Sequence, residues 1–537
     1  MADIRVRVGS EFSVPLKELP LKVRKKLENN LTFVNPEYKK KKRQNLYVKN
    51  IPQFLTFYSC RSDWMYMPRG FLQRATTILK ESGLSPKFLT RGVVTRSRGR
   101  VPLEDFNVSL RPYQLNALEK MHKGVQGVVQ MPCGAGKTEL GCAALLTTGE
   151  PGLVIVHTED ILDQWKNRIH RMSGDWPRVI SGTRRSDFSP LNPGEVAIAM
   201  IQTLCSAGSR ADDFLNSVGA VLTDECHHIP ARTWAKTLSS IKARYRWGLT
   251  ATPNRSDGLS FVLNLSLGET LFNITTQYLI DNGYLEQPLI VPVWTGWVVP
   301  EDCYPASALC TGCMKWRKTT IQKHNENKSR CSSCKSIIPK VNDLQRGKLN
   351  YSKALSEMSL DAGRMELVRR LVAKACDDGR TVLVLVPRKR AVSVLVTKLR
   401  WEGIEALGVT SDYNKETRAR FLREIREKKA SVIVATQLAD EGLDLPGVDC
   451  AINTSAGKHT GTAKQRVGRT LRKGGKDPIV FDFVDTGEFE RQWLIRAQAY
   501  RKEYGKCFYS AQPIETDLAI KVFEDVQKKE AQKLTGV

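Results

Sequence analysis

The chain has 537 residues, which is enough for about three to five domains of roughly 100–200 residues each. Its 83 Lys and Arg residues outnumber its 56 Asp and Glu residues, giving a formal net charge of +27; this excess favours a polyanionic partner, because basic side chains displace the counterions condensed on phosphates. No apolar run is long enough to cross a bilayer, and no apolar signal core follows Met1, so neither a membrane span nor secretion is expected. The 13 cysteines are therefore expected in a reducing compartment, cytoplasmic or nuclear, as thiols or metal ligands.

Residues 1–105 are predicted to form a basic N-terminal domain. They contain the basic run KKKKR at 39–43 and an aromatic stretch at 54–71. Aromatic residues indicate a packed unit rather than a disordered tail. The basic run is expected to grip phosphates, although a solvated loop and a nuclear-import signal are alternatives.

The rest of the chain reads as two α/β blocks. Short apolar, β-rich runs alternate with helical patterns over residues 106–275, and the same rhythm returns over 356–487. This rhythm predicts βαβ units, and hence parallel sheets flanked by helices. Residues 276–355 are expected to form a linker with a cysteine-containing insert at about 300–340, and 488–537 a helical tail.

Residues 131–138, MPCGAGKT, predict a phosphate-binding loop, because they follow a predicted strand and precede a helical pattern. Glycines let backbone N–H groups approach phosphates, and the helix N-terminus adds its positive end. Lys137 is expected to reach the β- and γ-phosphates of ATP, and Thr138 to bind Mg²⁺. The residues expected around the nucleotide phosphates are Gly134, Ala135, Gly136, Lys137, Thr138 and Glu139.

A second apolar strand, residues 220–222, is followed by Asp224 and Glu225. Asp224 is predicted to hold the metal through water, and Glu225 to orient and deprotonate the attacking water. The alternative of two solvated acids at a strand end is disfavoured by the phosphate loop upstream. His227 completes a D-E-x-H pattern, and His228 is expected to be structural.

Together these patterns resemble superfamily 2 helicases. The D-E-x-H residues and GLTATP at 248–253 resemble motifs II and III, TQLADEGLD at 436–444 resembles motif V, and QRVGRTLR at 465–472 resembles motif VI. LRPYQ at 110–114 resembles the adenine-reading motif of the XPB-like branch. Residues 157–159 with Gln164 and Trp165 resemble motif Ia, and Gln202 with Thr203 a later strand-contacting motif. The motifs follow the family's order from about 110 to 485.

The resemblance implies two tandem RecA-like domains with ATP and Mg²⁺ between them. Arg469 and Arg472 would stabilise the charge that builds on the γ-phosphoryl group, an effect of roughly 10³–10⁵ in rate. Gln465 would sense the nucleotide, whereas Arg466 is the weaker candidate and could be a structural partner. The remaining nucleotide contacts that the resemblance implies are Arg111 and Gln114 near the base, His227, Gly442 and Asp444.

Within the superfamily, the chain most resembles the XPB-like and phage branch-migration helicases. The resemblance implies an ATP-dependent DNA helicase or translocase on duplex, forked or four-way DNA, with branch migration or fork remodelling preferred. Contact with single-stranded nucleic acid is open, and a monomer is favoured. The alternatives are the motor subunit of a restriction or anti-phage system and an ATPase of the transcript-release type, which displaces proteins without separating strands. An RNA motor is less favoured, because the DEAD-box sequence is absent.

Two C-x₂-C pairs in the insert predict a structural zinc ribbon. Cys310 and Cys313 are separated by seventeen residues from Cys331 and Cys334, the spacing of a four-thiolate site. Between the pairs, KWRK at 315–318 suits phosphate contact with base stacking; a solvated rim with one packed Trp is the alternative.

Overall fold

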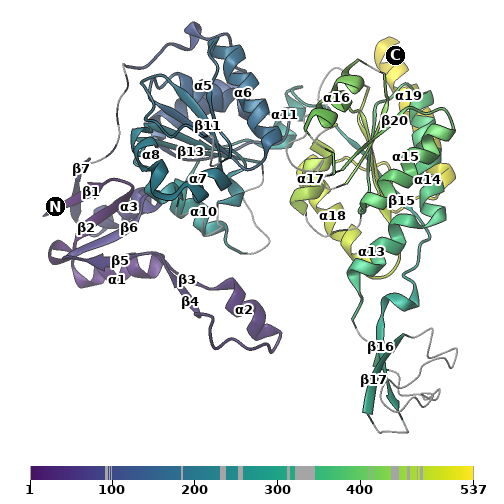
Figure 1. Cartoon of the computed structure of the whole chain (residues 1–537), viewed down its shortest axis with the longest axis horizontal. Helices are drawn as coiled ribbons and strands as arrows, with labels where there is room; N and C mark the ends of the chain where they lie inside the picture. Colours follow the sequence, from purple (N-terminus) through teal and green to yellow (C-terminus); the bar gives the residue numbers. More distant parts are fainter. Residues whose placement is uncertain are drawn as a thin grey trace. The chain divides into compact units, whose positions relative to one another are not determined.

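The structure is a computed structural model in two compact units, Met1–Tyr278 and Leu279–Val537 (Figure 1). It describes all residues except 1, 91–92, 94, 96, 98, 183–185, 230–236, 252–257, 311–314, 321–344, 347, 411, 414, 428, 437–446, 456, 458–459, 469, 472–475 and 536–537. For 305–310, 315–320, 345–346 and several positions in the helices at 415–426, 460–468 and 516–535, only the backbone is described.

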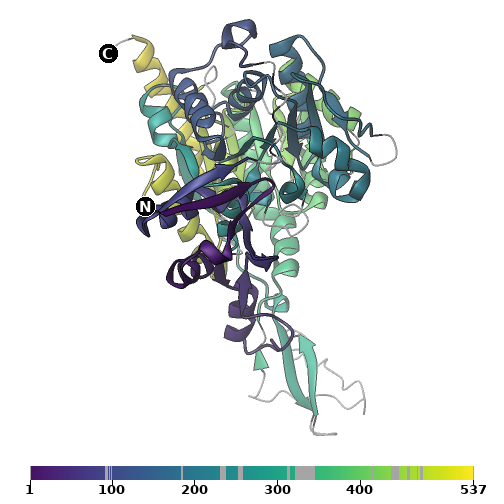
Figure 2. The same ribbon diagram turned by 90° about the vertical axis from the view of Figure 1, so that its left-hand side faces the viewer.

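The first unit begins with a five-stranded sheet in the order β5-β6-β2-β1-β7. Figure 2 shows the strands of this sheet in purple tones near the N-terminus. Alternate residues of β1 face inward, and Ile4, Val6 and Val8 pack with residues of two helices in one apolar cluster, as expected for a sheet with one buried face. Residues of this sheet and of its helices thus share one apolar core. The elements are β1 (Ala2–Val8), β2 (Glu11–Pro15), α1 (Leu21–Asn30), β5 (Ser59–Arg61), β6 (Trp64–Pro68), α3 (Leu72–Glu81) and β7 (Leu84–Leu89).

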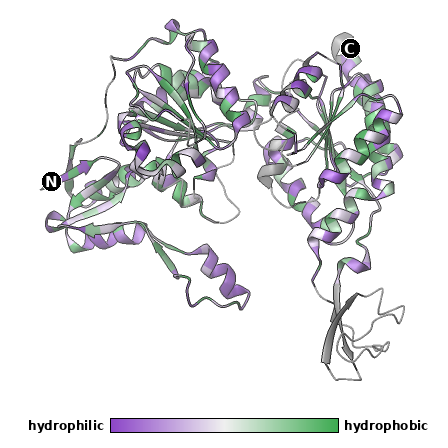
Figure 3. Cartoon of the chain, viewed as in Figure 1, coloured by the Kyte–Doolittle hydropathy of each residue, from purple (hydrophilic) through white to green (hydrophobic). Residues whose placement is uncertain are grey.

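A basic arm leads away from this sheet. It consists of the antiparallel pair β3 (Thr32–Val34) and β4 (Phe54–Thr56) and the helix α2 (Pro36–Arg43), which is hydrophilic along its whole length (Figure 3). The Asn35 side chain caps α2 by accepting the N–H of Glu37 at 3.0 Å, and Pro36 occupies the first turn, both favourable signals for a helix start.

The arm and its domain are fastened to the rest of the first unit. The Phe33 ring stacks on Phe261, with centroids 3.9 Å apart. Arg69 is buried and donates to the main-chain oxygens of Ala243 at 2.6 Å and Arg244 at 2.8 Å; burial lowers the pKa of Arg69 to about 10. A methyl group on Gly70 would lie 2.2 Å from the main-chain oxygen of Asn264, so only glycine allows this approach.

The first RecA-like domain is a seven-stranded sheet in the order β10-β11-β9-β12-β13-β8-β14. Every pairing in it is parallel, so the carboxyl ends of all strands meet at one edge, where α/β proteins bind ligands. The strands are β8 (Gln126–Gln130), β9 (Gly152–Val156), β10 (Arg178–Ile180), β11 (Val196–Met200), β12 (Ala220–Thr223), β13 (Tyr245–Thr250) and β14 (Thr270–Asn273). The helices include α4 (Pro112–Gly124), α5 (Lys137–Leu146), α6 (Glu159–Ser173), α7 (Ile201–Ala207), α8 (Asp212–Ser217) and α10 (Ser260–Leu267).

The second unit holds the other RecA-like sheet, in the order β15-β23-β22-β19-β21-β20. All five pairings are parallel, which confirms the predicted pair of parallel α/β sheets flanked by helices. Its strands are β15 (Leu289–Trp294), β19 (Val382–Leu385), β20 (Ala406–Val409), β21 (Val432–Ala435), β22 (Cys450–Asn453) and β23 (Ile479–Val484). Its helices include α13 (Tyr351–Leu360), α14 (Ala362–Asp377), α15 (Lys389–Trp401), α16 (Lys415–Arg426), α17 (Thr460–Gly468), α18 (Glu488–Tyr504) and α19 (Thr516–Thr535).

Two segments outside the predicted bounds of this domain belong to its core. Strand β15 falls in the expected linker, 276–355, but pairs with β23 along its whole length. Helix α19 falls in the expected tail, 488–537, but its Ala519, Val522 and Phe523 join the main apolar cluster of the second unit. Burial of these residues explains why both segments pack here rather than standing alone.

The insert forms a three-stranded antiparallel sheet of β16 (Pro305–Cys310), β17 (Lys315–Thr320) and β18 (Gln345–Arg346). Cys310 ends β16, whereas Cys313, Cys331 and Cys334 lie outside the described residues. The zinc ligand set therefore remains a prediction. Among the helices of the described parts of the chain, none is both long and apolar enough to span a membrane.

Candidate nucleotide site and motor motifs

The phosphate loop lies between β8 and α5, at the carboxyl edge of the first RecA-like sheet. Gly134 and Gly136 adopt left-handed backbone conformations, with φ of 77° and 75°, which favour glycine. A methyl group on Gly136 would lie 2.4 Å from Nε2 of Gln114. The Lys137 ammonium donates to the main-chain oxygens of Met131 at 3.2 Å and Pro132 at 3.3 Å, so the lysine lies folded over the loop it was predicted to serve.

The LRPYQ residues brace this loop from the start of α4. Buried Gln114 accepts the main-chain N–H of Arg111 at 2.8 Å and donates to the main-chain oxygen of Gly136 at 3.0 Å. The Tyr113 hydroxyl donates to the main-chain oxygen of Ala135 at 2.9 Å and accepts from Arg111 Nη1 at 3.0 Å. The motif predicts Arg111 and Gln114 near the base, but its pattern does not reveal these contacts to the loop backbone.

Asp224 and Glu225 follow β12 at the same edge. One oxygen of Asp224, Oδ1, accepts the N–H of Glu225 at 2.8 Å, and the other, Oδ2, accepts the indole N–H of Trp165 at 2.7 Å. Glu225 has φ of 42°, a left-handed conformation that is uncommon for a residue with a side chain and that is found at functional sites. The Oε2 atom of Glu225 is buried and accepts no hydrogen bond from a described residue.

The pKa values of the two carboxylates are shifted in opposite directions. Burial and the neighbouring Glu225 charge raise the pKa of Asp224. Burial also acts to raise the pKa of Glu225, but the His227 imidazole and the Lys137 ammonium outweigh it and lower that pKa to about 2. Glu225 is therefore ionised at neutral pH, as a proton acceptor must be.

Three histidines lie in a row beside Glu225. His227 Nδ1 lies 3.1 Å from the Thr250 hydroxyl and 3.4 Å from Glu225 Oε2, so it links motif II to motif III. The His228 ring lies 4.3 Å from His227 and 4.4 Å from His157, between centroids. His228 therefore joins the motif Ia segment to motif II, which agrees with a structural role and gives it a location that the sequence did not indicate.

The expected strand-contacting segments also meet at this edge. His157 follows β9, and its main-chain oxygen accepts the side-chain N–H of Gln202, at the start of α7, at 3.0 Å. Thr158 caps α6, since its hydroxyl accepts the N–H of Ile161 at 3.4 Å. Thr203 is buried, and its hydroxyl accepts the N–H of Gly182 at 3.1 Å, so Gln202 is the more accessible of the pair.

In the second unit, Arg466 of α17 belongs to a buried polar network. Its Nη1 donates to Asn453 Oδ1 at 2.9 Å, and Asn453 Nδ2 donates to Asp482 Oδ1 at 3.1 Å. Asp482 also accepts from Arg496 Nη2 at 2.9 Å and from the Tyr500 hydroxyl at 2.8 Å. This network ties Arg466 of α17 to β22, which holds Asn453, and through it to β23, which holds Asp482.

Four predicted nucleotide contacts, Gly442, Asp444, Arg469 and Arg472, lie outside the described residues, and of Gln465 only the helical backbone is described.

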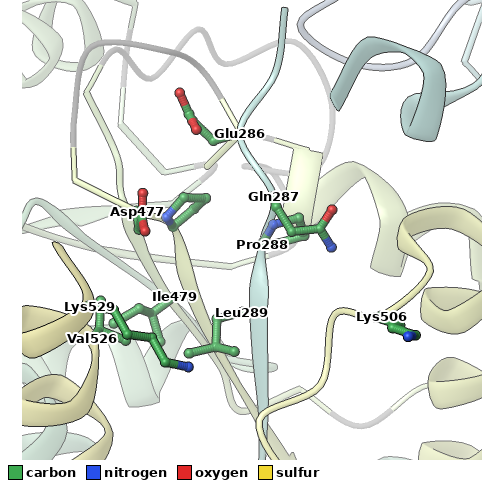
Figure 4. Close-up of a pocket in the computed structure, with 10 residues that line it drawn as sticks. Glu286, Gln287, Pro288, Leu289, Asp477, Ile479, Lys506, Val526 and Lys529 are labelled. Atoms are coloured by element: carbon green, nitrogen blue, oxygen red, sulfur yellow. The ribbon is translucent and has the colours of Figure 1, made fainter. Parts of the chain in front are cut away.

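The second unit also contains a hollow of about 200 Å³ (Figure 4). It lies at the starts of β15 and β23, with Leu289 and Ile479 in its wall. This is the amino edge of the sheet, opposite to the edge at which α/β proteins bind nucleotides.

Comparison with known families matches two regions of the chain. Residues 107–255 match the family described as "Type III restriction enzyme, res subunit", and residues 363–474 match "Helicase conserved C-terminal domain". The first match covers the phosphate loop and the D-E-x-H residues, and the second covers α17.

Two curated relatives match most of the chain. "DNA 3'-5' translocase XPB2" of Sulfurisphaera tokodaii is 24% identical over 391 residues, covering 72% of this chain and 84% of the relative. "DNA 3'-5' helicase XPB" of Kineococcus radiotolerans is 24% identical over 427 residues, covering 78% and 67%. Among solved structures, Dbp5 of S. cerevisiae bound to RNA and ADP BeF₃ is similar, with a TM-score of 0.50, 15% identity and coverage of 78% of this chain and 93% of that one.

The fold and the site define a phosphate-loop ATP hydrolase with two RecA-like domains. Within that class, the matched families and relatives support a superfamily 2 helicase of the XPB-like type.

Proposed function

We propose that this chain is an ATP-driven DNA motor that acts on duplex or branched DNA, by branch migration or by remodelling forks and junctions. The observation that carries the proposal is the convergence of the phosphate loop, Asp224, Glu225 and the His157–Gln202 contact on one edge of one parallel sheet. An ATP site and a nucleic-acid track that share an edge can be coupled through the same strands. The relatives named as DNA 3'-5' translocase and helicase support DNA as the track.

The site fits ATP and Mg²⁺. Gly134 and Gly136 have left-handed backbones and carry no Cβ atom that would block the approach of phosphates to the loop N–H groups, and the Glu225 carboxylate lies beside the loop lysine, whose charge lowers its pKa. When bound, the metal would neutralise charge on the phosphates. Lys137 would contact the β- and γ-phosphates, and Glu225 would accept the proton of the attacking water. The further contacts proposed are Thr138 and Asp224 to Mg²⁺, Arg111 and Gln114 to the base, and Glu139, His227, Gly442 and Asp444 around the nucleotide.

The residues proposed to complete the site come from motif VI. Arg469 and Arg472 would stabilise charge on the γ-phosphoryl group, worth roughly 10³–10⁵ in rate, and Gln465 would sense the nucleotide. The buried bond between Arg466 and Asn453 supports this division of roles, because it commits the third arginine of the motif to holding α17.

The test is stimulation of ATPase activity by single-stranded DNA, duplex, fork, four-way junction and RNA of matched length. We expect duplex or branched DNA to stimulate hydrolysis more than RNA does, and junctions to be converted to their branch-migrated products. Stimulation by RNA alone would overturn the DNA assignment. Stimulation by DNA without conversion of forks or junctions would overturn the branched-DNA role and leave a translocase.

A motor subunit of a restriction system is the second candidate, and the family description matched by residues 107–255 favours it. Such a motor would translocate on plain duplex and would need a partner chain for cleavage. Two assays distinguish the candidates: displacement of a bound protein from duplex DNA, and strand separation on a fork. A restriction motor or a transcript-release ATPase should displace the protein without separating strands, whereas a junction remodeller should act on the fork.

Neutralising the basic arm should weaken DNA binding without changing the maximal ATPase rate. Lys39, Lys40, Lys42 and Arg43 of α2 are exposed, whereas Lys41 pairs with Glu37 at 2.9 Å. Changing the four exposed residues to glutamine should flatten the slope of log K against log salt by roughly 0.9 for each duplex phosphate that the arm no longer neutralises. The DNA concentration for half-maximal ATPase should rise.

The matched control removes the same charge from the body of the N-terminal domain. It replaces four other exposed basic residues, Lys22, Lys25, Arg74 and Lys80. If both variants weaken binding equally, only net charge matters; if the arm variant keeps the parent's affinity and salt slope, the arm does not bind DNA.

We also propose that the insert holds one structural zinc through Cys310, Cys313, Cys331 and Cys334. The support is the antiparallel pairing of β16 and β17, in which Cys310, the first of the four cysteines, ends β16. The purified protein should contain one zinc per chain by metal analysis. Cys334→Ser should lose it, and Cys60→Ser, which changes an exposed free thiol elsewhere, should keep it. Protein prepared without chelators and found free of zinc would contradict the ribbon.

A further inference from the structure

Trp165 contacts the carboxylate of Asp224 from inside the protein. Its indole is fully buried, and Nε1 donates to Asp224 Oδ2 at 2.7 Å. Because Oδ1 accepts the N–H of Glu225 at 2.8 Å, both oxygens of Asp224 have a fixed donor. The carboxylate plane is therefore set by two bonds, one from the backbone beside it and one from α6.

The Trp165 ring is closely packed on the side that faces α5. A methyl group on Gly141 of α5 would lie 2.4 Å from Cη2 of Trp165, 3.0 Å from a methyl of Leu249 and 3.1 Å from a methyl of Leu222. The indole therefore fills the space between α5, which begins at Lys137, and the sheet strands that lead to motifs II and III. Glycine at 141 is what allows the ring to lie so close to α5.

We propose that Trp165 is a positioning residue that holds the Asp224 carboxylate in the orientation needed for Mg²⁺ bound with ATP. The inference rests on the proposed function of the site. An indole N–H is a donor only and cannot itself bind a cation, so Trp165 acts through Asp224. Partners of this kind fix the orientation of metal-binding side chains, and their loss typically costs about 10–100-fold in metal affinity or activity.

The chain offers a matched control in Trp247. It is also fully buried, lies in β13 of the same sheet, and donates its indole N–H to the main-chain oxygen of Met121 at 3.1 Å. Changing either tryptophan to phenylalanine therefore removes one buried hydrogen bond and a similar volume. Only at Trp165 is the acceptor the carboxylate assigned to the metal.

The experiment measures binding of a fluorescent ATP analogue to the full chain over a series of Mg²⁺ concentrations, without DNA. In Trp165→Phe, the Mg²⁺ concentration for half-maximal enhancement of binding should rise about 10–100-fold, while binding in excess chelator should match the parent. Trp247→Phe should show the parent's Mg²⁺ dependence. Equal Mg²⁺ dependence in Trp165→Phe and Trp247→Phe would overturn the inference.

A second variant keeps the test decisive if Trp165→Phe fails to fold, as judged by thermal melting beside Trp247→Phe. Gly141→Ala keeps Trp165 but adds a methyl group that presses on the indole from the α5 side, so the Mg²⁺ concentration required should also rise. An unchanged Mg²⁺ requirement in folded Gly141→Ala would overturn the inference. A parent protein that binds the analogue with no Mg²⁺ dependence would instead contradict the ATP and Mg²⁺ site on which the inference rests.

Discussion

Glu225→Gln should bind ATP and DNA as the parent protein does and hydrolyse ATP about 10²–10⁴-fold more slowly. The substitution keeps the shape of the side chain and removes its ability to accept a proton. In the structure, Oε2 of Glu225 is buried and lies 3.4 Å from Nδ1 of His227. The His227 and Lys137 charges keep the pKa of Glu225 at about 2 against burial. The base is therefore already ionised, and its loss should not be compensated by raising the pH.

The measurement is steady-state ATPase at saturating DNA, beside direct binding of nucleotide and DNA. Glu119→Gln is the control, because Glu119 is an exposed carboxylate on α4 that pairs with Lys123; its turnover should match the parent's. Parent-like turnover in Glu225→Gln would show that another group accepts the proton.

The pH dependence of stability at Glu225 follows from the same pKa. Folding lowers the pKa of Glu225 from its ordinary value of 4.5 to about 2, so the unfolded chain binds more protons than the folded one between these values. The stability gained from ionised Glu225 is then fully present above about pH 4.5 and is lost as the pH falls toward 2. In Glu225→Gln this contribution is absent, so the melting temperature of the variant should fall less on acidification than that of the parent.

Those parts of the fold and site that depend on short sequence spacing could be predicted. A phosphate loop after one strand and Asp224–Glu225 after another identify the carboxyl edge of a parallel sheet, because parallel strands share that edge. The structure places β8, β9, β12 and β13 in one sheet, so motifs that lie far apart in the sequence meet there. The alternation of apolar runs and helical patterns was enough to predict both sheets.

Contacts between distant segments could not be predicted. Trp165 precedes Asp224 by 59 residues, and its place in the motif Ia pattern does not reveal its bond to the Asp224 carboxylate. His228 looked structural, yet its position between His157 and His227 depends on two loops approaching in space. Strand β15 has no βαβ rhythm around it, and only its pairing with β23 reveals its place. Such features arise from tertiary packing, which local patterns do not record.

Lys137→Ala should abolish most ATP hydrolysis while leaving nucleotide-free DNA binding intact. In the structure the ammonium lies over the loop, bonded to the main-chain oxygens of Met131 and Pro132, where phosphates would displace it. Removing it deletes the positive charge that would stabilise the transferring phosphoryl group, and loss of one such preorganised group typically costs about 10²–10³ in kcat. The segments around His157 and Gln202, which are proposed to contact DNA, are joined by a hydrogen bond of their own.

The substitution should also raise the pKa of the two neighbouring carboxylates, Asp224 and Glu225. Lys137 is among the charges that lower the pKa of both Asp224 and Glu225, so its removal favours protonation of Asp224, whose pKa burial already raises. A fall in Mg²⁺-dependent nucleotide binding should therefore accompany the fall in turnover. The ATPase rate at saturating ATP measures the loss of hydrolysis, and fluorescence anisotropy with labelled DNA measures the retained DNA binding. Lys123→Ala, which removes an exposed lysine on α4, should change neither. ATPase activity retained by Lys137→Ala would overturn the phosphate-loop assignment, because that assignment makes Lys137, which lies over the loop backbone, the cation for the γ-phosphate.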